Sequence, residues 1–298
     1  MASDNPIVSI GIPVYNSEKF ISDTLNSIVS QSYKELEIII SDNASTDATS
    51  EICKSYSERD IRIKYVRQEY NLGSDLNFKY VFDVAKGEFF MWHAAHHLRS
   101  HDYVEKNIIF LKNNPLYVAS GSPDCFKDEI NDPSKLAFFS FDGNCYNNLK
   151  CFLNNCWRSH GIFYSLIRKT TIGSTELIGW KCIAQDWILI IYLLLKGKIH
   201  RVQEGRLLLG REGQSNSNVP FDGLINKKIE HFFPLYEFTL YFIKSISFEN
   251  EIGVVEKINL YSIIFWLNIK YKIREGINVI LRAAQITANN LFMRKDKV

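Results

Sequence analysis

Apolar, β-prone runs alternate with amphipathic segments through the first 120 residues, and this alternation leaves few folds open to the chain. The apolar runs cover residues 7–14, 36–41, 61–66, 89–92 and 117–120. The segments with helical periodicity cover residues 18–31, 46–57, 74–85 and 102–113. Strands that alternate with helices form right-handed βαβ units. The pattern therefore predicts an α/β fold with a mostly parallel sheet flanked by helices.

The carboxyl ends of the predicted strands mark the expected binding site, because ligands of parallel sheets bind there. These ends are residues 13–15, 41–45, 67 and 93–97. The last of them follows an apolar strand and carries histidines and alanines.

The second half of the chain gives a less regular pattern. Residues 126–157 are polar and rich in turn signals, which predicts a long connection over the site. An apolar helix is expected over 184–195 and a strand over 199–202. After Pro220 the chain becomes aromatic and rich in Lys and Arg, which predicts a helical C-terminal extension over 221–298.

Composition indicates a globular protein and excludes some functions. Hydrophobic residues make up 46% of the 298 residues, and the net charge of +2 gives no reason to expect nucleic acid as a partner. No basic segment with a following apolar run begins the chain, and no window of about 20 residues lacks charge. The six cysteines are expected to be thiols in a cytoplasmic protein.

Three short motifs, each after a predicted strand, carry a resemblance to a known family. They are residues 8–16 followed by Glu18, residues 41–47 (Ser-Asp-Asn-Ala-Ser-Thr-Asp), and Asn71-Leu72-Gly73. Together they resemble family 2 nucleotide-sugar glycosyltransferases, over about residues 7–217. The resemblance implies the Rossmann-like GT-A fold, a nucleoside diphosphate sugar as donor, and inversion at the anomeric carbon. It divides residues 1–220 into a nucleotide-binding half, to about residue 122, and an acceptor half.

The resemblance also implies a donor pocket at the strand ends. Its expected lining is Pro13, Tyr15, Asp42, Asn43, Arg67, Asn71 and Gly73. Asp42 or Asn43 is expected to pair with the edge of a pyrimidine, which favours a UDP-sugar. The alternative is that Asp42, Asn43 and Ser45 only form an Asx turn and cap a helix.

The loop at residues 93–97 departs from the family's pattern. Its metal-binding Asp-x-Asp motif aligns with Ala94 and His96, and a histidine ligand in a later loop aligns with Arg211. Mg²⁺ and Mn²⁺ prefer oxygen ligands, so these side chains make a poor site for either ion. We therefore expect Arg211, with His96, to bind the departing diphosphate and the activity to be independent of metal.

Other readings of the same loop stay open. His96 is the remaining candidate ligand if Mn²⁺ or Mg²⁺ is bound after all. A zinc site could use His93, His96, His97 and His101, or these rings could simply hydrogen-bond in a polar loop. Arg211 could be an ordinary surface arginine.

A Gln-Asp-Trp sequence opens the apolar helix and resembles the family's catalytic motif. Its aspartate, Asp186, would be the general base that takes the acceptor's proton. The dipole of the helix is expected to keep the carboxylate ionised, although Asp186 could instead be only a cap. His160 and Trp187 match positions that face the acceptor.

The basic C-terminal extension has two interpretations. Basic amphipathic helices bind anionic membranes, and a glycan or lipid-linked acceptor would give such binding a purpose. This predicts a cytoplasmic protein held at the inner face of the membrane. A helical bundle with solvated charges is the alternative. The alternative to an enzyme is a non-catalytic protein that has the same fold, lacks the metal motif, and only binds sugar nucleotides or glycans.

Overall fold

The computed structural model describes residues 8–173, 183–212 and 233–295. The chain divides into two compact units. One comprises Met1–Lys181 and Gln185–Pro220, and the other comprises Cys182–Ala184 and Phe221–Val298. The finer division of the first unit into nucleotide and acceptor halves stays a prediction.

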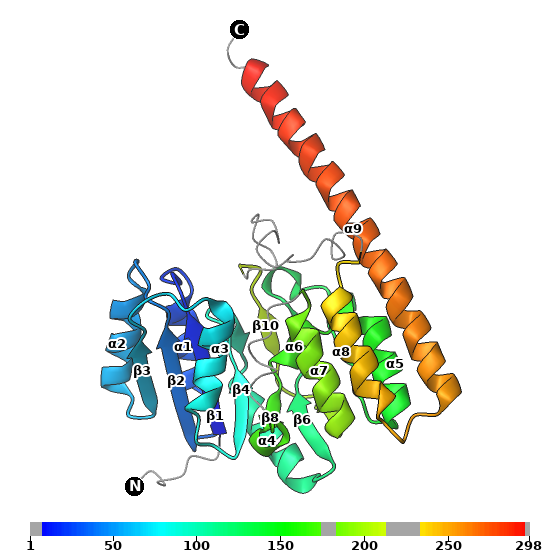
Figure 1. Ribbon diagram of the computed structural model, residues 1–298. Helices are drawn as coiled ribbons and strands as arrows, with labels where there is room; N and C mark the ends of the chain where they lie inside the picture. The colour runs from blue at the N-terminus through cyan, green and yellow to red at the C-terminus, as the bar shows by residue number, and fades with distance from the viewer. Residues whose placement is uncertain (1–7, 174–182, 213–232, 296–298) are drawn as a thin grey trace. The chain divides into compact units, whose positions relative to one another are not determined.

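A seven-stranded sheet forms the centre of the first unit (Figure 1). Its strands are β1 (Val8–Val14), β2 (Leu36–Asp42), β3 (Ile63–Arg67), β4 (Phe89–Trp92), β6 (Tyr117–Gly121), β8 (Leu166–Arg168) and β9 (Lys198–Arg201). Their order is β3-β2-β1-β4-β8-β6-β9, and only β8 pairs in the antiparallel sense. The prediction of a mostly parallel sheet is confirmed.

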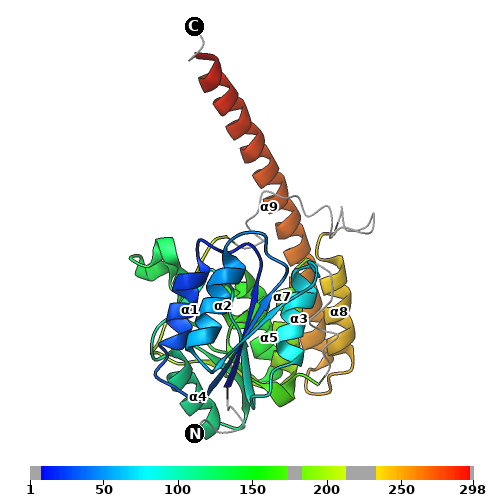
Figure 2. The same cartoon turned by 90° about the vertical axis from the view of Figure 1, so that its left-hand side faces the viewer.

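Helices cover both faces of this sheet (Figures 1 and 2). Helices α1 (Ile21–Val29), α2 (Thr49–Arg59) and α4 (Tyr103–Asn113) lie on one face. Helices α3 (Ser74–Asp83) and α7 (Gln185–Lys196) lie on the other. Alternate residues of β1 serve the two faces, since Ile10 and Ile12 join the core with α1 while Gly11 faces α3. A Cβ on Gly11 would lie 2.6 Å from Cγ2 of Val81, so only glycine fits there.

Short elements that the sequence did not predict complete the first unit. A three-stranded sheet joins β5 (Leu98–Arg99), β10 (Leu207–Leu209) and β7 (Asp124–Phe126). Helix α5 (Cys145–Asn155) lies inside the segment expected to be a long connection, so that expectation was wrong in part. The many polar residues of α5 obscure its helical pattern in the sequence, although Leu149, Phe152 and Leu153 are buried. Asn144 caps the helix. Helix α6 (His160–Phe163) follows.

The second unit contains α8 (Tyr236–Ser247) and α9 (Val254–Lys295), as the predicted helical extension requires. Phe238 and Phe242 of α8 are buried, as are Leu260 and Ile264 of α9. The side chain of Asn268 accepts a hydrogen bond from the backbone of Leu235 at 3.1 Å. Among the described helices, none combines the length and hydropathy that crossing a bilayer requires.

Candidate active site

The order of the strands creates a switch point between β1 and β4. β1 pairs with β2 on one side and with β4 on the other, both in parallel. The chain runs outward from β1 to β2 and β3 and then returns past β1 to β4, so the strand order reverses between β1 and β4. A crevice at such a point is where open α/β sheets bind ligands. The predicted site residues at the ends of β1, β2, β3 and β4 are brought to this edge.

Hydrogen bonds tie the loop after β1 to the loop after β2. The side chain of Asn16 accepts from the backbone of Thr46 at 2.9 Å, and the backbone of Asn16 donates to Oγ of Ser45 at 3.0 Å. The backbone of Asn43 donates to the carbonyl of Val14 at 2.9 Å. The two loops therefore form one surface beside Pro13 and the exposed ring of Tyr15.

The carboxylate of Asp42 is fully buried and holds the loop after β2. It accepts from the backbone of Ser45 at 2.9 Å, from the hydroxyl of Ser50 at 2.6 Å, and from the hydroxyl of Tyr65 at 2.9 Å. Burial alone would raise its pKa, but these hydrogen bonds hold the pKa of Asp42 below its usual value. Burial, together with the hydrogen bond to Asp42 and its charge, raises the pKa of Tyr65 to about 12. The carboxylate is thus occupied by the protein itself.

Asn43 holds a third loop in the same way. Its amide donates to the side chain of Asn71 at 2.8 Å and to the carbonyl of Gly73 at 3.2 Å, and its oxygen accepts from the backbone of Leu72. Gly73 has a φ of 86°, which the tight turn requires. Asn71 is exposed and the side chain of Arg67 is 52% exposed, so these groups, with Tyr15, are open to a ligand.

Among the residues that the structure describes, three other than glycine have left-handed backbones, and all lie beside predicted site residues. Their φ values are 46° for Asn16, 60° for Ala44 and 66° for Ala184. Such backbones cost free energy and cluster at functional sites. Asn16 follows Tyr15, Ala44 follows Asn43, and Ala184 precedes Gln185 and Asp186.

The loop after β4 places three imidazoles close together. The rings of His96 and His97 lie 4.6 Å apart, and those of His93 and His97 lie 6.3 Å apart. Nδ1 of His97 accepts from the backbone of Gly210 at 3.1 Å. Burial lowers the pKa of His96 and places those of His93 and His97 well below their usual value. Burial therefore favours the neutral form of all three rings, and a protonated His96 as the partner of a diphosphate gains no support.

These residues do not fit a divalent cation. Ala94 has no ligand atom, and His97 uses Nδ1 for Gly210. Among residues 8–173, 183–212 and 233–295, no three His, Cys, Asp or Glu side chains form a group that could hold a metal ion. His96 alone is a poor ligand set for Mn²⁺ or Mg²⁺. The described part of the chain gives no zinc cluster either.

Arg211 follows β10 and is paired with two carboxylates. Its Nε lies 2.8 Å from Oδ2 of Asp128, and its Nη2 lies 2.8 Å from Oε1 of Glu129. The guanidinium also covers the ring of Phe126 at 3.9 Å. Arg211 would have to leave both acids to meet a diphosphate, so its predicted role gains no support from its contacts.

A second arginine, Arg99 of β5, is buried and has no acidic partner in the described part of the chain. It is 4% exposed and donates to the carbonyls of Trp92 at 3.0 Å and Tyr164 at 2.8 Å. Its Nε donates to Nδ1 of His93 at 3.3 Å, and it covers the ring of Tyr103. The sequence analysis missed Arg99, because arginine is normally exposed and no sequence signal marks a buried one.

Asp186 lies half-buried in the first turn of α7. Burial raises the pKa of its carboxyl, while His160 and backbone N–H groups oppose the rise. The expectation that the helix dipole dominates is thus corrected, because desolvation is the larger effect. Asp186 in turn raises the pKa of Tyr164, whose ring contacts His97 at 4.6 Å. The carboxylate is therefore within electrostatic reach of the end of β4.

The two predicted acceptor residues differ in exposure. His160 is exposed and its ring lies 5.6 Å from that of Phe126. Trp187 is only 6% exposed and packs against Phe152 and Trp157. His160 can therefore meet a ligand directly, whereas the indole of Trp187 supports the wall behind Asp186.

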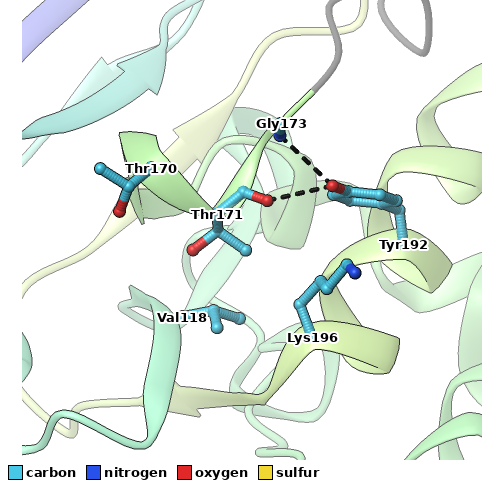
Figure 3. Close-up of a pocket in the computed structure, with 6 residues that line it drawn as sticks. All are labelled: Val118, Thr170, Thr171, Gly173, Tyr192 and Lys196. Carbon is cyan, nitrogen blue, oxygen red and sulfur yellow. Dashed lines mark hydrogen bonds between the residues drawn. The ribbon is translucent and has the colours of Figure 1, made fainter.

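A hollow of about 460 Å³ lies away from these groups (Figure 3). It is lined by Val118, Thr170, Thr171, Gly173, Tyr192 and Lys196. The hydroxyl of Tyr192 donates to the carbonyl of Thr171 at 3.1 Å and accepts from the backbone of Gly173. Val118 lies near the start of β6 and Lys196 ends α7, so the hollow is at the opposite edge of the sheet.

Replacement of Asp42 by Asn should destabilise the first unit in a pH-dependent manner. Asn leaves buried donors of Ser45, Ser50 or Tyr65 unpaired, which costs about 1–3 kcal/mol at pH 7. A depressed carboxyl pKa adds stability above the unfolded value, near about 3.9, and that stability is lost as the pH falls through the folded value. Urea unfolding should therefore show a difference between the two proteins at pH 7 that shrinks below about pH 4. Asp83→Asn, at an exposed pair with Lys79, is the control. A difference that is constant with pH would contradict this account of Asp42.

Comparison with known proteins agrees with the fold. Residues 9–179 match glycosyl transferase family 2. TuaG of Bacillus subtilis, a putative teichuronic acid biosynthesis glycosyltransferase, is 32% identical over 111 residues, which are 37% of this chain and 44% of TuaG. The chain matches less than half of the length of the first curated relatives.

Two solved structures share the architecture. S. aureus TarS in complex with UDP-GlcNAc has a TM-score of 0.67 at 18% identity, over 87% of this chain and 71% of that one. The mannosyltransferase PcManGT from Pyrobaculum calidifontis, in complex with GDP-Man and Mn²⁺, has a TM-score of 0.58 at 16% identity, over 95% and 76%. These likenesses concern the fold, which is the GT-A fold. The match over residues 9–179, more than half of the chain, shows that the chain belongs to glycosyl transferase family 2.

Proposed function

We propose that the protein moves a sugar from a UDP-sugar to a hydroxyl group of a glycan or lipid-linked acceptor, with inversion at the anomeric carbon. The observation that carries this proposal is the carboxylate of Asp186, half-buried and with a raised pKa, within electrostatic reach of the end of β4. Membership of the family supports it. UDP-GlcNAc in the TarS complex supports a UDP-sugar, and the name of TuaG supports a polysaccharide product.

In this mechanism Asp186 takes the proton of the acceptor hydroxyl. The hydroxyl oxygen then forms a bond to the anomeric carbon on the face opposite the diphosphate. The bond between that carbon and the diphosphate oxygen breaks, and the diphosphate leaves with the electron pair. A carboxylate with a raised pKa is the better proton acceptor, provided that it is still ionised at the working pH. The exposed His160 borders the acceptor side.

The donor lies at the ends of β1, β2 and β3 in this proposal. Tyr15, Arg67 and Asn71 are exposed and meet the nucleotide, beside Pro13 and Gly73. Asp42 and Asn43 shape the pocket through the hydrogen bonds that fix its loops, and their side chains reach the base only if those bonds are exchanged.

Asp186→Asn should abolish transfer and leave donor binding nearly intact. Loss of a general base commonly costs about two to four powers of ten in rate. The raised pKa also means that the folded chain binds the proton of Asp186 more tightly than the unfolded chain does. Ionisation of Asp186 therefore lowers the stability of the wild type as the pH rises through the folded pKa. The Asn variant does not ionise at this position and keeps that stability. The variant should melt no lower than wild type at pH 8.

Three measurements decide this prediction: the initial rate of transfer, calorimetry with UDP and GDP, and thermal melting. Asp142→Asn, at a half-exposed carboxylate beside His200, is the matched control. Transfer within about threefold of wild type would remove Asp186 from the mechanism. Binding of UDP by a protein that transfers no sugar to any acceptor would favour the rival, a non-catalytic binding protein.

We also propose that transfer does not depend on a divalent metal. The basis is the chemistry of the side chains, because Ala94 and the neutral His96 and His97 replace the hard oxygen ligands that Mn²⁺ prefers. In excess EDTA the initial rate should stay at about half or more of its value with added manganese. Loss of activity in EDTA with recovery on addition of manganese would show that a metal is held after all.

The second unit is proposed to bind an anionic membrane surface through α9. Ile258, Phe265, Trp266 and Ile273 are each more than half exposed, and the exposed Lys270 lies among them. Apolar groups with neighbouring cations suit the interface of an anionic bilayer. The double variant Phe265→Ser, Trp266→Ser should sediment less with phosphatidylserine vesicles than wild type does. Phe248→Ser, an exposed position outside α9, is the control. Equal sedimentation of all three proteins would favour the solvated bundle.

A further inference from the structure

Arg99 is a buried charge that the described protein leaves uncompensated. Its guanidinium is 4% exposed, and no carboxylate among the described residues forms an ion pair with it. Two backbone carbonyls, one imidazole and one aromatic ring are its partners. Burial lowers the pKa of Arg99, but arginine stays charged because its ordinary value is so high. A buried cation without an acid is costly, so its retention needs a reason.

Arg201, the other buried arginine among the described residues, has an acidic partner. Nη2 of Arg201 lies 2.5 Å from Oδ1 of Asp124, and both side chains are at most 3% exposed. That pair joins the end of β9 to β7 and is neutral as a whole. Arg99 is as buried as Arg201 but has no acidic partner among the described residues. Packing alone therefore does not account for it.

The position of Arg99 is at the switch point of the sheet. Its Nη2 lies 3.0 Å from the carbonyl of Trp92, the last residue of β4. The next residue, His93, donates its backbone N–H to the carbonyl of Gly11 in β1 at 2.8 Å. The positive charge is therefore fixed at the carboxyl end of β4, beside β1, where the strand order reverses.

Two buried donors at this place have no acceptor in the described structure. One is Nη1 of Arg99 and the other is Nε2 of His93. Nδ1 of His93 accepts from Arg99, and the ring is neutral, so its proton is on Nε2. Buried donors are normally paired, so these two unpaired donors add to the uncompensated positive potential at the end of β4.

We infer that Arg99 is the fixed positive charge that attracts the donor's diphosphate to the end of β4, where a metal ion would otherwise act. This inference rests on the proposed function, because it takes a nucleoside diphosphate as the ligand. Arg99 acts from beneath the loop of residues 94–97 and need not touch the diphosphate. In a medium of low dielectric constant a unit charge is felt across several ångströms. The charge is also in place before the reaction, so it helps the departing diphosphate without reorganisation.

The arrangement of charges agrees with this role. Arg99 lowers and Asp186 raises the pKa of Tyr164, so the cation and the carboxylate act on the same ring in opposite directions. The cation would serve the leaving group and the carboxylate the acceptor hydroxyl. Arg211, which is paired with Asp128 and Glu129, is not required for either task.

The first test needs only the wild-type protein. In excess EDTA, calorimetry should show that UDP binds at least about tenfold more tightly than uridine, since each factor of ten corresponds to about 1.4 kcal/mol. Equal affinities for UDP and uridine in EDTA would overturn the inference. If UDP binds tightly only with manganese, the inference fails and the proposed function stands. If no nucleoside diphosphate binds with or without manganese, both fail.

The second test removes the charge. Arg99→Gln should weaken UDP binding by about tenfold or more and leave uridine binding unchanged, whereas Arg99→Lys should keep most of the difference between the two ligands. Arg168→Gln is the matched control. Arg168 also donates to two backbone carbonyls, those of Leu111 and Tyr117, and covers the ring of Phe89, but it lies beside the amino end of β4, opposite to the end that Arg99 contacts. It should leave both affinities within about twofold of wild type.

A purely structural role for Arg99 predicts a different result. UDP and uridine would then weaken together, in proportion to the fall in melting temperature, and that outcome would overturn the inference. If Arg99→Gln does not fold, the comparison of UDP with uridine in wild type and in Arg99→Lys decides the matter. A loss of the preference for UDP in a folded Arg99→Lys protein would also count against a role based on charge.

Discussion

The pairing of β1 with β2 on one side and β4 on the other is the constraint on which the rest of the site depends. Every residue of β1 is buried, so the strand cannot shift its register without moving apolar side chains out of the core. Its alternate residues serve two faces, and Gly11 leaves no room for a side chain against Val81. The fixed register sets the heights at which the loops after β1, β2 and β4 begin. The first of these loops carries Tyr15, an exposed group of the proposed donor site.

Polar residues at the strand ends hold loops, and some of them are also exposed; Arg67, for example, donates to the carbonyl of Ser45 at 2.7 Å while its side chain is 52% exposed. Asp42 and Asn43 are buried and spend their hydrogen bonds on neighbouring loops. Arg67 and Tyr15 are exposed at the same edge. A fixed scaffold of this kind reduces the reorganisation that binding requires. The left-handed backbone of Ala44 is tolerated because hydrogen bonds of its two neighbours, Asn43 and Ser45, hold it in place.

Much of the fold could be predicted from the sequence, because long apolar strands and periodic helices leave a clear pattern. β1, β2 and β4 are examples. β5, β7 and β10 could not, since strands of two or three residues have no periodicity. That Asp42 ends a strand and Asp186 opens a helix could also be predicted from the sequence, but their burial and their neighbours could not. Burial outweighs the helix dipole at Asp186, and Arg99 is buried without an acid. Both effects depend on tertiary packing, which short motifs do not encode.

One feature of the sheet has a bearing on how the chain is made. β8 lies between β4 and β6, although it follows β6 in the chain. During synthesis from the N-terminus, β1 to β4 can assemble while β4 still lacks its outer neighbour. β6 likewise has no strand pairing that joins it to β1–β4 until residues 166–168 have emerged from the ribosome. The facing edges of both strands stay unsatisfied for that interval, and open strand edges invite pairing with other chains. The short antiparallel strand thus joins the two parts of the nascent sheet before β9 pairs with β6.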